Sequence, residues 1–87
     1  MKKPYLENGI YRHYKGDTYE VLDVVLHTET NEWLVLYKAR SYTFQDDEAR
    51  EVLFVRPYEM FISDIDKDGS SMKRFTKLST DDTPQYI

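Results

Sequence analysis

The sequence predicts an all-β domain of five to six short antiparallel strands, and three observations point to that fold class. Aromatic residues make up 15% of the 87 residues, with eight Tyr and four Phe, and such side chains suit a pleated, half-buried sheet. Turn signals recur along the chain, at Gly16-Asp17, Thr30-Asn31 and Asp68-Gly69. The segment 46–50 can form one helical turn but is too short to bury a helix face. A chain of this length has one modest core, so we expect a single domain.

The first half of the chain predicts three strands joined by tight turns. Residues 9–15 form the first strand, and residues 18–28 form the longest one. Strict alternation along this second strand puts Val21 and Val24 on opposite faces, both of which are largely apolar. Asn31 in the next turn tolerates a left-handed backbone. Residues 32–42 form the third strand, one face of which carries Trp33, Val35, Tyr37 and Ala39.

The second half of the chain begins with a solvated loop at residues 43–51, which is rich in acidic side chains. Residues 52–56 predict a buried strand that ends at Pro57, since proline cannot donate to a strand ladder. Residues 58–65 begin as a short 3₁₀ turn, at residues 57–60, and continue as a strand through Phe61, Ile62 and Ile65. After the Asp68-Gly69 hairpin turn, residues 72–78 form the last strand, with two inward side chains, Phe75 and Leu78. Five or six strands with regular turns predict a small SH3-like barrel, since closure removes unpaired edges.

The expected organisation is an N-terminal lead-in at residues 1–8, one barrel domain at residues 9–78 and a flexible tail at residues 79–87. No apolar run approaches the roughly 18 residues of a membrane span. The start of the chain, Met1-Lys2-Lys3-Pro4, leads into no apolar signal core. We therefore expect a cytoplasmic protein without a membrane partner.

Composition excludes several kinds of chemistry. The absence of cysteine removes disulfides, thiolate catalysis, zinc ribbons and iron–sulfur sites. There is no Gly-x-Ser-x-Gly elbow for a nucleophilic serine, and the three glycines lie too far apart for a phosphate-binding loop. The net charge of −4 disfavours a polybasic nucleic-acid binder. We expect no cofactor.

Three local patterns are candidates for chemistry. His13 and His27, with Glu29 orienting one imidazole, form an acid–base pair if they lie on one side of adjacent strands. Otherwise they are partly exposed strand residues with backbone partners. The run 64–69 matches the first half of a calcium loop, but its twelfth position is Phe75 instead of a bidentate glutamate, so we predict no metal site.

Basic side chains interleaved with aromatic ones are the third pattern, typical of single-strand nucleic-acid binders. The same tyrosines also suit recognition of an extended protein segment, because they offer large contact areas at low entropic cost. The basic positions are Arg12, Lys15, Lys38, Arg40, Lys73, Arg74 and Lys77, and the aromatic ones are Tyr11, Tyr14, Tyr37 and Phe75.

The chain also resembles a known family. The runs that carry the likeness are GIYRHYKG at 9–16, YEVL at 19–22, HTET at 27–30, VLY at 35–37, VRP at 55–57, MF at 60–61 and RF at 74–75. In this order they are similar to the DUF1653 family, short and mostly bacterial proteins of unknown function. The resemblance implies an SH3-type barrel and no established activity, substrate or cofactor. One departure is Phe54, where the family typically has tryptophan; another is the acidic stretch at 45–48.

These patterns together favour a binding or accessory module over an enzyme. The expected ligand is a protein segment or a small anion, with Arg56 as a forked donor for a carboxylate or phosphate. The weaker alternatives are an acid–base enzyme that uses His13 and His27, and a single-stranded nucleic-acid binder. The expected binding surface consists of Arg12, His13, Tyr14, His27, Glu29, Tyr37 and Arg56.

Overall fold

The computed structural model describes residues 2–40, 48 and 50–78, and it confirms the all-β class. Within these residues the chain forms seven strands and a single helical turn, α1 (Tyr58–Phe61). The strands are β1 (Gly9–His13), β2 (Thr18–His27), β3 (Glu32–Ala39), β4 (Leu53–Pro57), β5 (Asp64–Lys67), β6 (Ser70–Lys73) and β7 (Phe75–Lys77).

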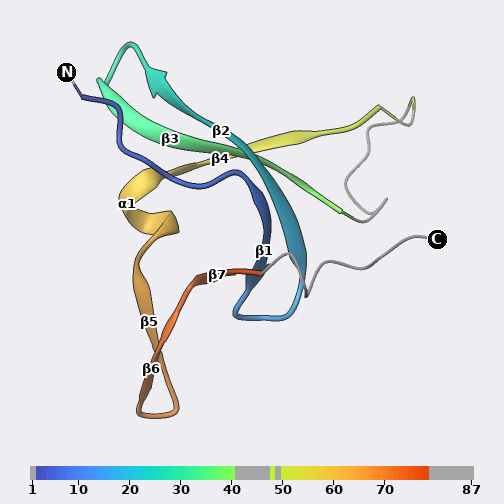
Figure 1. Cartoon of the computed structure of the whole chain (residues 1–87), viewed down its shortest axis with the longest axis vertical. Helices are drawn as coiled ribbons and strands as arrows, with labels where there is room; N and C mark the ends of the chain where they lie inside the picture. The colour runs from blue at the N-terminus through green and yellow to red at the C-terminus, as the bar shows by residue number, and fades with distance from the viewer. Residues whose placement is uncertain (1, 41–47, 49, 79–87) are drawn as a thin grey trace.

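Five strands form one antiparallel sheet in the order β4-β3-β2-β1-β7, and β5 pairs with β6 in a separate hairpin. The long β2–β3 pair is the centre of the sheet, and the β5–β6 hairpin projects away from it (Figure 1). Among the described residues β4 and β7 do not pair with each other, so this sheet does not close through backbone hydrogen bonds. The resulting shape is a bent five-stranded sheet with an attached hairpin.

The predicted turns have the backbone that their residues favour. Asn31 has a φ of 58°, which confirms the expected left-handed conformation in the β2–β3 turn. Asp68 and Gly69, between β5 and β6, have φ values of 54° and 81°. Two consecutive positive φ values match the right-handed twist of a two-residue hairpin, and Asp-Gly adopts them at low cost.

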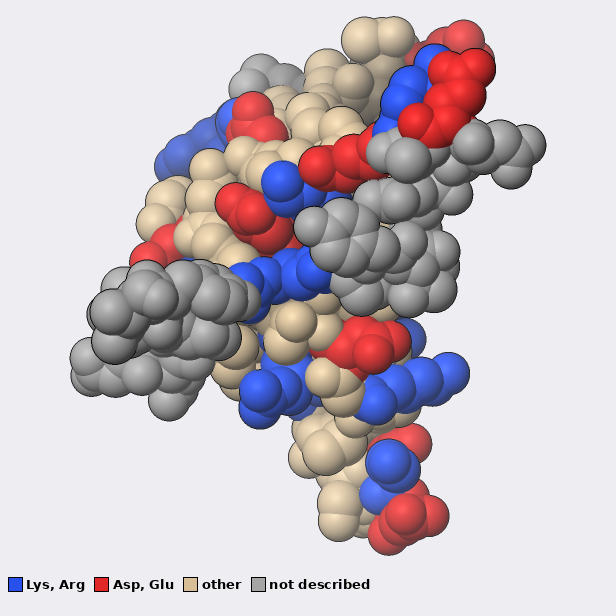
Figure 2. Space-filling view, turned by 90° about the vertical axis from the view of Figure 1, so that its right-hand side faces the viewer, with Lys and Arg blue, Asp and Glu red and all other residues tan. Residues whose placement is uncertain are grey.

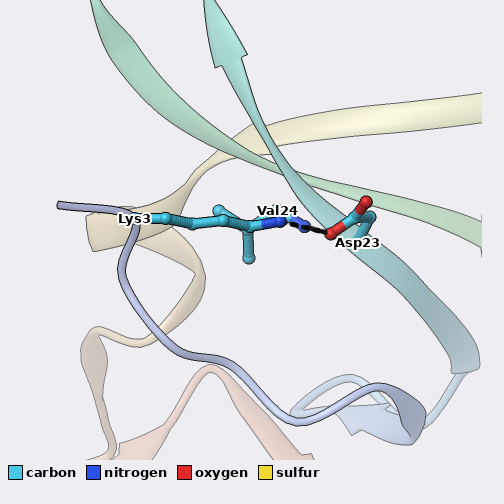
Figure 3. A network of polar contacts seen from close by, with 3 residues as sticks. All are labelled: Lys3, Asp23 and Val24. Atoms are coloured by element: carbon cyan, nitrogen blue, oxygen red, sulfur yellow. Dashed lines mark hydrogen bonds and ion pairs between the residues drawn. The ribbon is translucent and has the colours of Figure 1, made fainter. Parts of the chain in front are cut away.

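A β-bulge in β2 changes which side chains face the core. The register with β3 shifts between Val21 and Asp23, so Val21 and Val24 are both buried. The prediction that alternation places them on opposite faces was therefore wrong, because one inserted residue reverses the alternation beyond it. The Asp23 carboxylate accepts from the Val24 backbone N–H at 2.7 Å and from Lys3 Nζ at 2.9 Å (Figure 3). The bonds from Lys3 and Val24, together with the charge of Lys3, lower the pKa of Asp23.

The core lies on one face of the sheet and is mostly aromatic. The rings of Phe61 and Phe75 stack at 4.0 Å, and Tyr11 meets Phe61 edge-on at 5.4 Å. Such ring pairs add about 0.5–1.5 kcal/mol beyond the burial of their area. Helix α1 thus contributes to the core through Phe61, which is 1% exposed. The buried cluster consists of Tyr11, Val21, Val35, Tyr37, Phe61 and Phe75.

Three predictions about the second half of the chain were wrong. Phe61 and Ile62 are not in a strand, because Phe61 ends α1 and Ile62 is its C-cap. Residues 52–56 are not a buried strand, because Leu53 is 49% and Val55 is 54% exposed on the edge strand β4. Only Phe54 and Arg56 on the alternate side face the core side of the sheet, opposite Tyr37 and Val35. The last strand is divided at Arg74 into β6 and β7, which belong to different sheets. Phe75 is buried as predicted, and Leu78 is half-buried.

Residues 2–8 cross the open end of the core as an ordered segment. The Tyr11 hydroxyl donates to the Glu7 carbonyl at 2.6 Å, and the Tyr58 hydroxyl donates to the Tyr5 carbonyl at 3.2 Å. Burial, with a contribution from the nearby Glu7 carboxylate, raises the pKa of Tyr11 to about 12. Leu6 packs against the core cluster.

Three predicted segments lie wholly or largely outside the described residues: the end of the third strand at 41–42, most of the loop at 43–51, and the tail at 79–87. Within the described part of the chain, no helix is long and apolar enough to cross a membrane.

Candidate functional site

His13 lies at the end of β1 among aromatic rings. It pairs across the sheet with Phe75, and the two ring centroids are 4.8 Å apart. The Tyr14 ring lies 4.4 Å from the imidazole. His13 Nδ1 accepts the backbone N–H of Lys15 at 3.2 Å. A neutral imidazole that accepts at Nδ1 carries its proton on Nε2, so His13 presents an N–H donor there.

Arg56 reaches this cluster from the opposite edge of the sheet. It lies on β4, and its guanidinium carbon is 5.2 Å from the centroid of the Phe75 ring on β7. Its Nε donates to the Tyr37 hydroxyl at 3.3 Å. The Arg56 side chain therefore connects β4 and β7, the two edge strands of the sheet, through a cation–π contact. Among the described residues, no backbone ladder joins these two strands. Arg56 is half-buried and has no carboxylate partner among the described residues.

Arg74 is the second half-buried arginine near His13. It lies between β6 and β7, where its backbone carbonyl accepts the Tyr14 N–H at 2.9 Å. Its Nε donates to the Ser63 hydroxyl at 3.3 Å, and its backbone N–H donates to the Ser63 carbonyl at 3.0 Å. These bonds hold Arg74 beside β1, and within the described part of the chain no acid forms an ion pair with it.

The surroundings of His13 lower its pKa. Burial is the main cause, and the positive charges of Arg56, Lys15 and Arg74 act in the same direction, whereas Asp17 opposes them. Three of the charged groups that act on His13 are therefore cations and one is an acid. Tyr19 on β2 meets the His13 ring edge-on at 6.5 Å and the Phe75 ring at 6.0 Å. We call His13, Tyr14, Tyr19, Arg56, Arg74 and Phe75 the His13 cluster.

A groove opens beside His13, where β1 meets β6 and β7. Its volume is about 310 Å³. Figure 2 shows Lys and Arg side chains gathered across this part of the molecule, above the projecting β5–β6 hairpin. Two cations, Arg12 and Lys73, lie on the walls of the groove, which is lined by Arg12, His13, Tyr14, Gly16, Met72, Lys73, Thr76 and Leu78.

The structure brings together only some of the predicted site residues. His13, Tyr14, Tyr37 and Arg56 meet around Phe75, and the exposed Arg12 reaches the His13 groove from the other face of β1. Tyr37 is buried and only 6% exposed, so it supports Arg56 from within the core.

His27 and Glu29 are not part of this cluster. His27 pairs with Glu32 at the β2–β3 turn, whereas Arg12, next to His13, pairs with Thr18 at the other end of β2. From Thr18 to His27, β2 advances by nine residue steps, which corresponds to about 30 Å along an extended strand. His27 Nδ1 accepts the Glu29 backbone N–H at 3.3 Å, a local turn contact. An acid–base mechanism that needs both imidazoles in one cleft therefore has no geometric basis.

Arg74, Tyr19 and Phe75 are members of the cluster that the predicted binding surface did not include. Arg74 was visible as a polar residue of the RF run, and Phe75 as an inward aromatic side chain. The proximity of Phe75 and Arg74 to His13 depends on the pairing of β1 with β7, which are about sixty residues apart in the chain. No local sequence signal reports that pairing.

Several of the predicted basic positions are already paired. Lys38 contacts Glu20 at 3.7 Å and Glu51 at 3.2 Å, and Lys77 contacts Glu7 at 3.9 Å.

Asp64, Asp66 and Asp68 lie on an exposed hairpin, and the described residues contain no group of three or more metal-ligating side chains that could hold a metal ion.

The comparisons with known proteins agree with the fold. A family model described as "Protein of unknown function (DUF1653)" matches residues 9–77. A crystal structure of a DUF1653-family protein from Bordetella bronchiseptica is similar, with a TM-score of 0.71 and 26% sequence identity. The match covers 84% of this chain and 87% of that chain. Among curated proteins no match was found.

Proposed function

The chain belongs to the DUF1653 family, and we propose that it is a binding module whose ligand is a small oxyanion, a carboxylate or a phosphate, held beside His13. The observation that carries this proposal is the pair of half-buried arginines, Arg56 and Arg74, which form no ion pair with an acid within the described ranges. Charged groups removed from water normally acquire a partner of opposite charge.

The chemistry of the His13 cluster suits an oxyanion. A guanidinium offers parallel N–H donors that match the two oxygens of a carboxylate or phosphate. His13 adds an Nε2–H donor, and Arg12 and Lys73 line the groove through which a ligand would enter. The Phe75 and Tyr37 contacts restrict the Arg56 side chain before a ligand arrives, which lowers the entropic cost of binding.

The test is a titration followed by NMR, with inorganic phosphate and acetate as separate ligands and sodium chloride at matched ionic strength. We expect saturable shifts at His13, Tyr14 and Arg74 with an oxyanion but not with chloride. Arg56→Gln should weaken binding about tenfold or more, because it removes a charge-assisted hydrogen bond. Arg56→Lys keeps the positive charge but loses the parallel N–H donors of the guanidinium. Its affinity for the oxyanion should therefore lie between those of the wild-type protein and Arg56→Gln.

The matched control is Lys67→Gln, which makes the same change in net charge on the exposed β5 strand. If Arg56→Gln and Lys67→Gln weaken binding equally, the effect is general electrostatic attraction and the proposed site is wrong. Circular dichroism confirms that each variant folds. The His27 resonance, from the far end of β2, is an internal reference in every spectrum.

A phosphate in single-stranded nucleic acid is a second candidate, favoured by Lys15, whose Nζ lies 5.8 Å from the centroid of the Tyr14 ring, and by the nearby Arg12 and Lys73. A short oligothymidylate distinguishes the two ligands. Nucleic-acid binding should be much tighter than phosphate binding and should weaken steeply between low and physiological salt. Equal affinity for phosphate and oligothymidylate supports the small anion.

A further inference from the structure

A second groove lies at the opposite end of β2 from the His13 cluster and has different chemistry. Its volume is about 380 Å³. Three segments form it: the N-terminal residues, the β2–β3 turn, and the junction between β4 and α1. We call it the Trp33 groove; its lining residues are Lys2, Pro4, Asn31, Glu32, Trp33, Pro57, Tyr58 and Glu59.

The walls of the Trp33 groove are rich in ring-containing side chains. They contain the one tryptophan of the chain and two of its three prolines. Trp33 and Tyr58 are half-buried, and the Tyr58 hydroxyl is held by the Tyr5 carbonyl at 3.2 Å. Aromatic walls of this kind bind extended proline-containing segments, whose polyproline II backbone loses little entropy on docking.

The rim of the groove is acidic. Glu32 and Glu59 are exposed, and neither forms an ion pair with a side chain in the described parts of the chain. Lys2 is the one cation among the lining residues. Two carboxylates beside two aromatic rings complement a partner with a guanidinium or ammonium group, through charge and cation–π attraction.

The chain's own N-terminal segment already shows this combination of residues at the groove. Lys2 and Pro4, from the run Lys2-Lys3-Pro4, line one wall, and Pro4 is half-buried there. Pro57 on another wall has φ −52° and ψ 135°, close to polyproline II geometry. A basic segment that contains proline is therefore compatible with the surface of this groove.

We propose that the Trp33 groove binds an extended segment of a partner protein that carries proline next to an arginine or lysine. Proline rings would pack against Trp33 and Tyr58, and the cation would face Glu32 and Glu59. This site is separate from the His13 cluster and does not depend on the proposed oxyanion function.

Trp33 supplies the measurement, because its fluorescence reports on the groove alone. The probes are three short blocked peptides: a proline-rich one with two arginines, the same peptide with glutamates in place of the arginines, and a glycine-serine peptide with two arginines. We expect a saturable change in emission with the first, and affinities at least tenfold weaker with the other two. Equal affinity for the two arginine peptides, or no change with any peptide, overturns the proposal.

Charge variants locate the binding. Glu32→Gln combined with Glu59→Gln should weaken the arginine–proline peptide about fivefold, while Lys2→Ala should strengthen its binding. The control is Asp64→Asn combined with Asp66→Asn, which makes the same change in charge on the exposed hairpin. Weakening by the control pair to the same extent contradicts the site. Arg56→Gln should leave peptide binding unchanged, so failure of one site is distinguishable from failure of the other.

Discussion

At the scale of single residues, Arg56 links the His13 cluster to the opposite edge of the sheet. Its Nε bond to Tyr37 and its contact with Phe75 place one cation between the two edges of the sheet. Tyr37 also meets Tyr19 at 5.5 Å, so the same ring belongs to the core and supports the site. The sequence identified His13, Tyr14, Tyr37 and Arg56 as polar positions with possible roles, and these residues do meet. Local sequence held no information on which of these side chains contact one another.

The lowered pKa of His13 predicts how stability depends on pH. Folding lowers this pKa below the unfolded value of about 6.5, so the unfolded chain binds more protons in the range just below it. His13 should therefore contribute stability above about pH 6.5 that is lost as the pH falls through its folded pKa. Urea unfolding between about pH 5 and 7.5 measures how steeply the free energy of unfolding rises with pH, and His13→Gln should reduce this slope. NMR titration of Arg56→Gln should show the pKa of His13 raised. A slope that His13→Gln leaves unchanged contradicts the prediction.

At the scale of elements, the single turn of helix α1 completes the core. The sequence predicted a short helical turn after Pro57, and the structure has α1 there as a single helical turn instead of a 3₁₀ turn. Its four residues bury one side chain, Phe61, between Tyr11 and Phe75, while its neighbour Met60 is 47% exposed. The bulge in β2 has a comparable role, since it turns Val24 as well as Val21 toward the buried side.

The contrast between Phe61 and Met60 gives a stability test within α1. Phe61→Ala should lower the free energy of unfolding by about 3–5 kcal/mol, because it leaves a cavity beneath the stacked Phe75 ring. Met60→Ala should change it by less than about 0.5 kcal/mol. Urea denaturation of both variants measures the difference, and similar losses in the two would show that the core packing described for Phe61 is wrong.

At the scale of the whole molecule, the five-stranded sheet and the β5–β6 hairpin differ in how they are stabilised. The sheet holds the aromatic core, whereas seven of the eight hairpin strand residues are exposed and Ile65 is half-buried. An isolated two-stranded hairpin is marginally stable in water. Arg74 and Ser63 join the base of the hairpin to the body, so its tip depends on local hydrogen bonds and its Asp68-Gly69 turn.

Amide hydrogen exchange tests this division. The backbone amides of β5 and β6 should exchange through local opening, about a hundredfold or more faster than those of Val21 and Val35. The core amides should exchange only on global unfolding. Equal protection across the hairpin and the central strands would indicate that the hairpin unfolds together with the sheet.

Sequence by itself determined the all-β class, the Asn31 and Asp68-Gly69 turns, the shared face of Val35 and Tyr37, the inward position of Phe75, and the family. These follow from local rules: side-chain alternation, turn chemistry and ordered motifs. Tertiary structure alone decided that β4 is an exposed edge, that the last strand divides between two sheets, and that a bulge reverses the alternation in β2. It also separated His27 and Glu29 from His13 and placed Arg56 against Phe75. The physical reason is that strand pairing and bending join residues far apart in the chain, and local sequence patterns contain no measure of those distances.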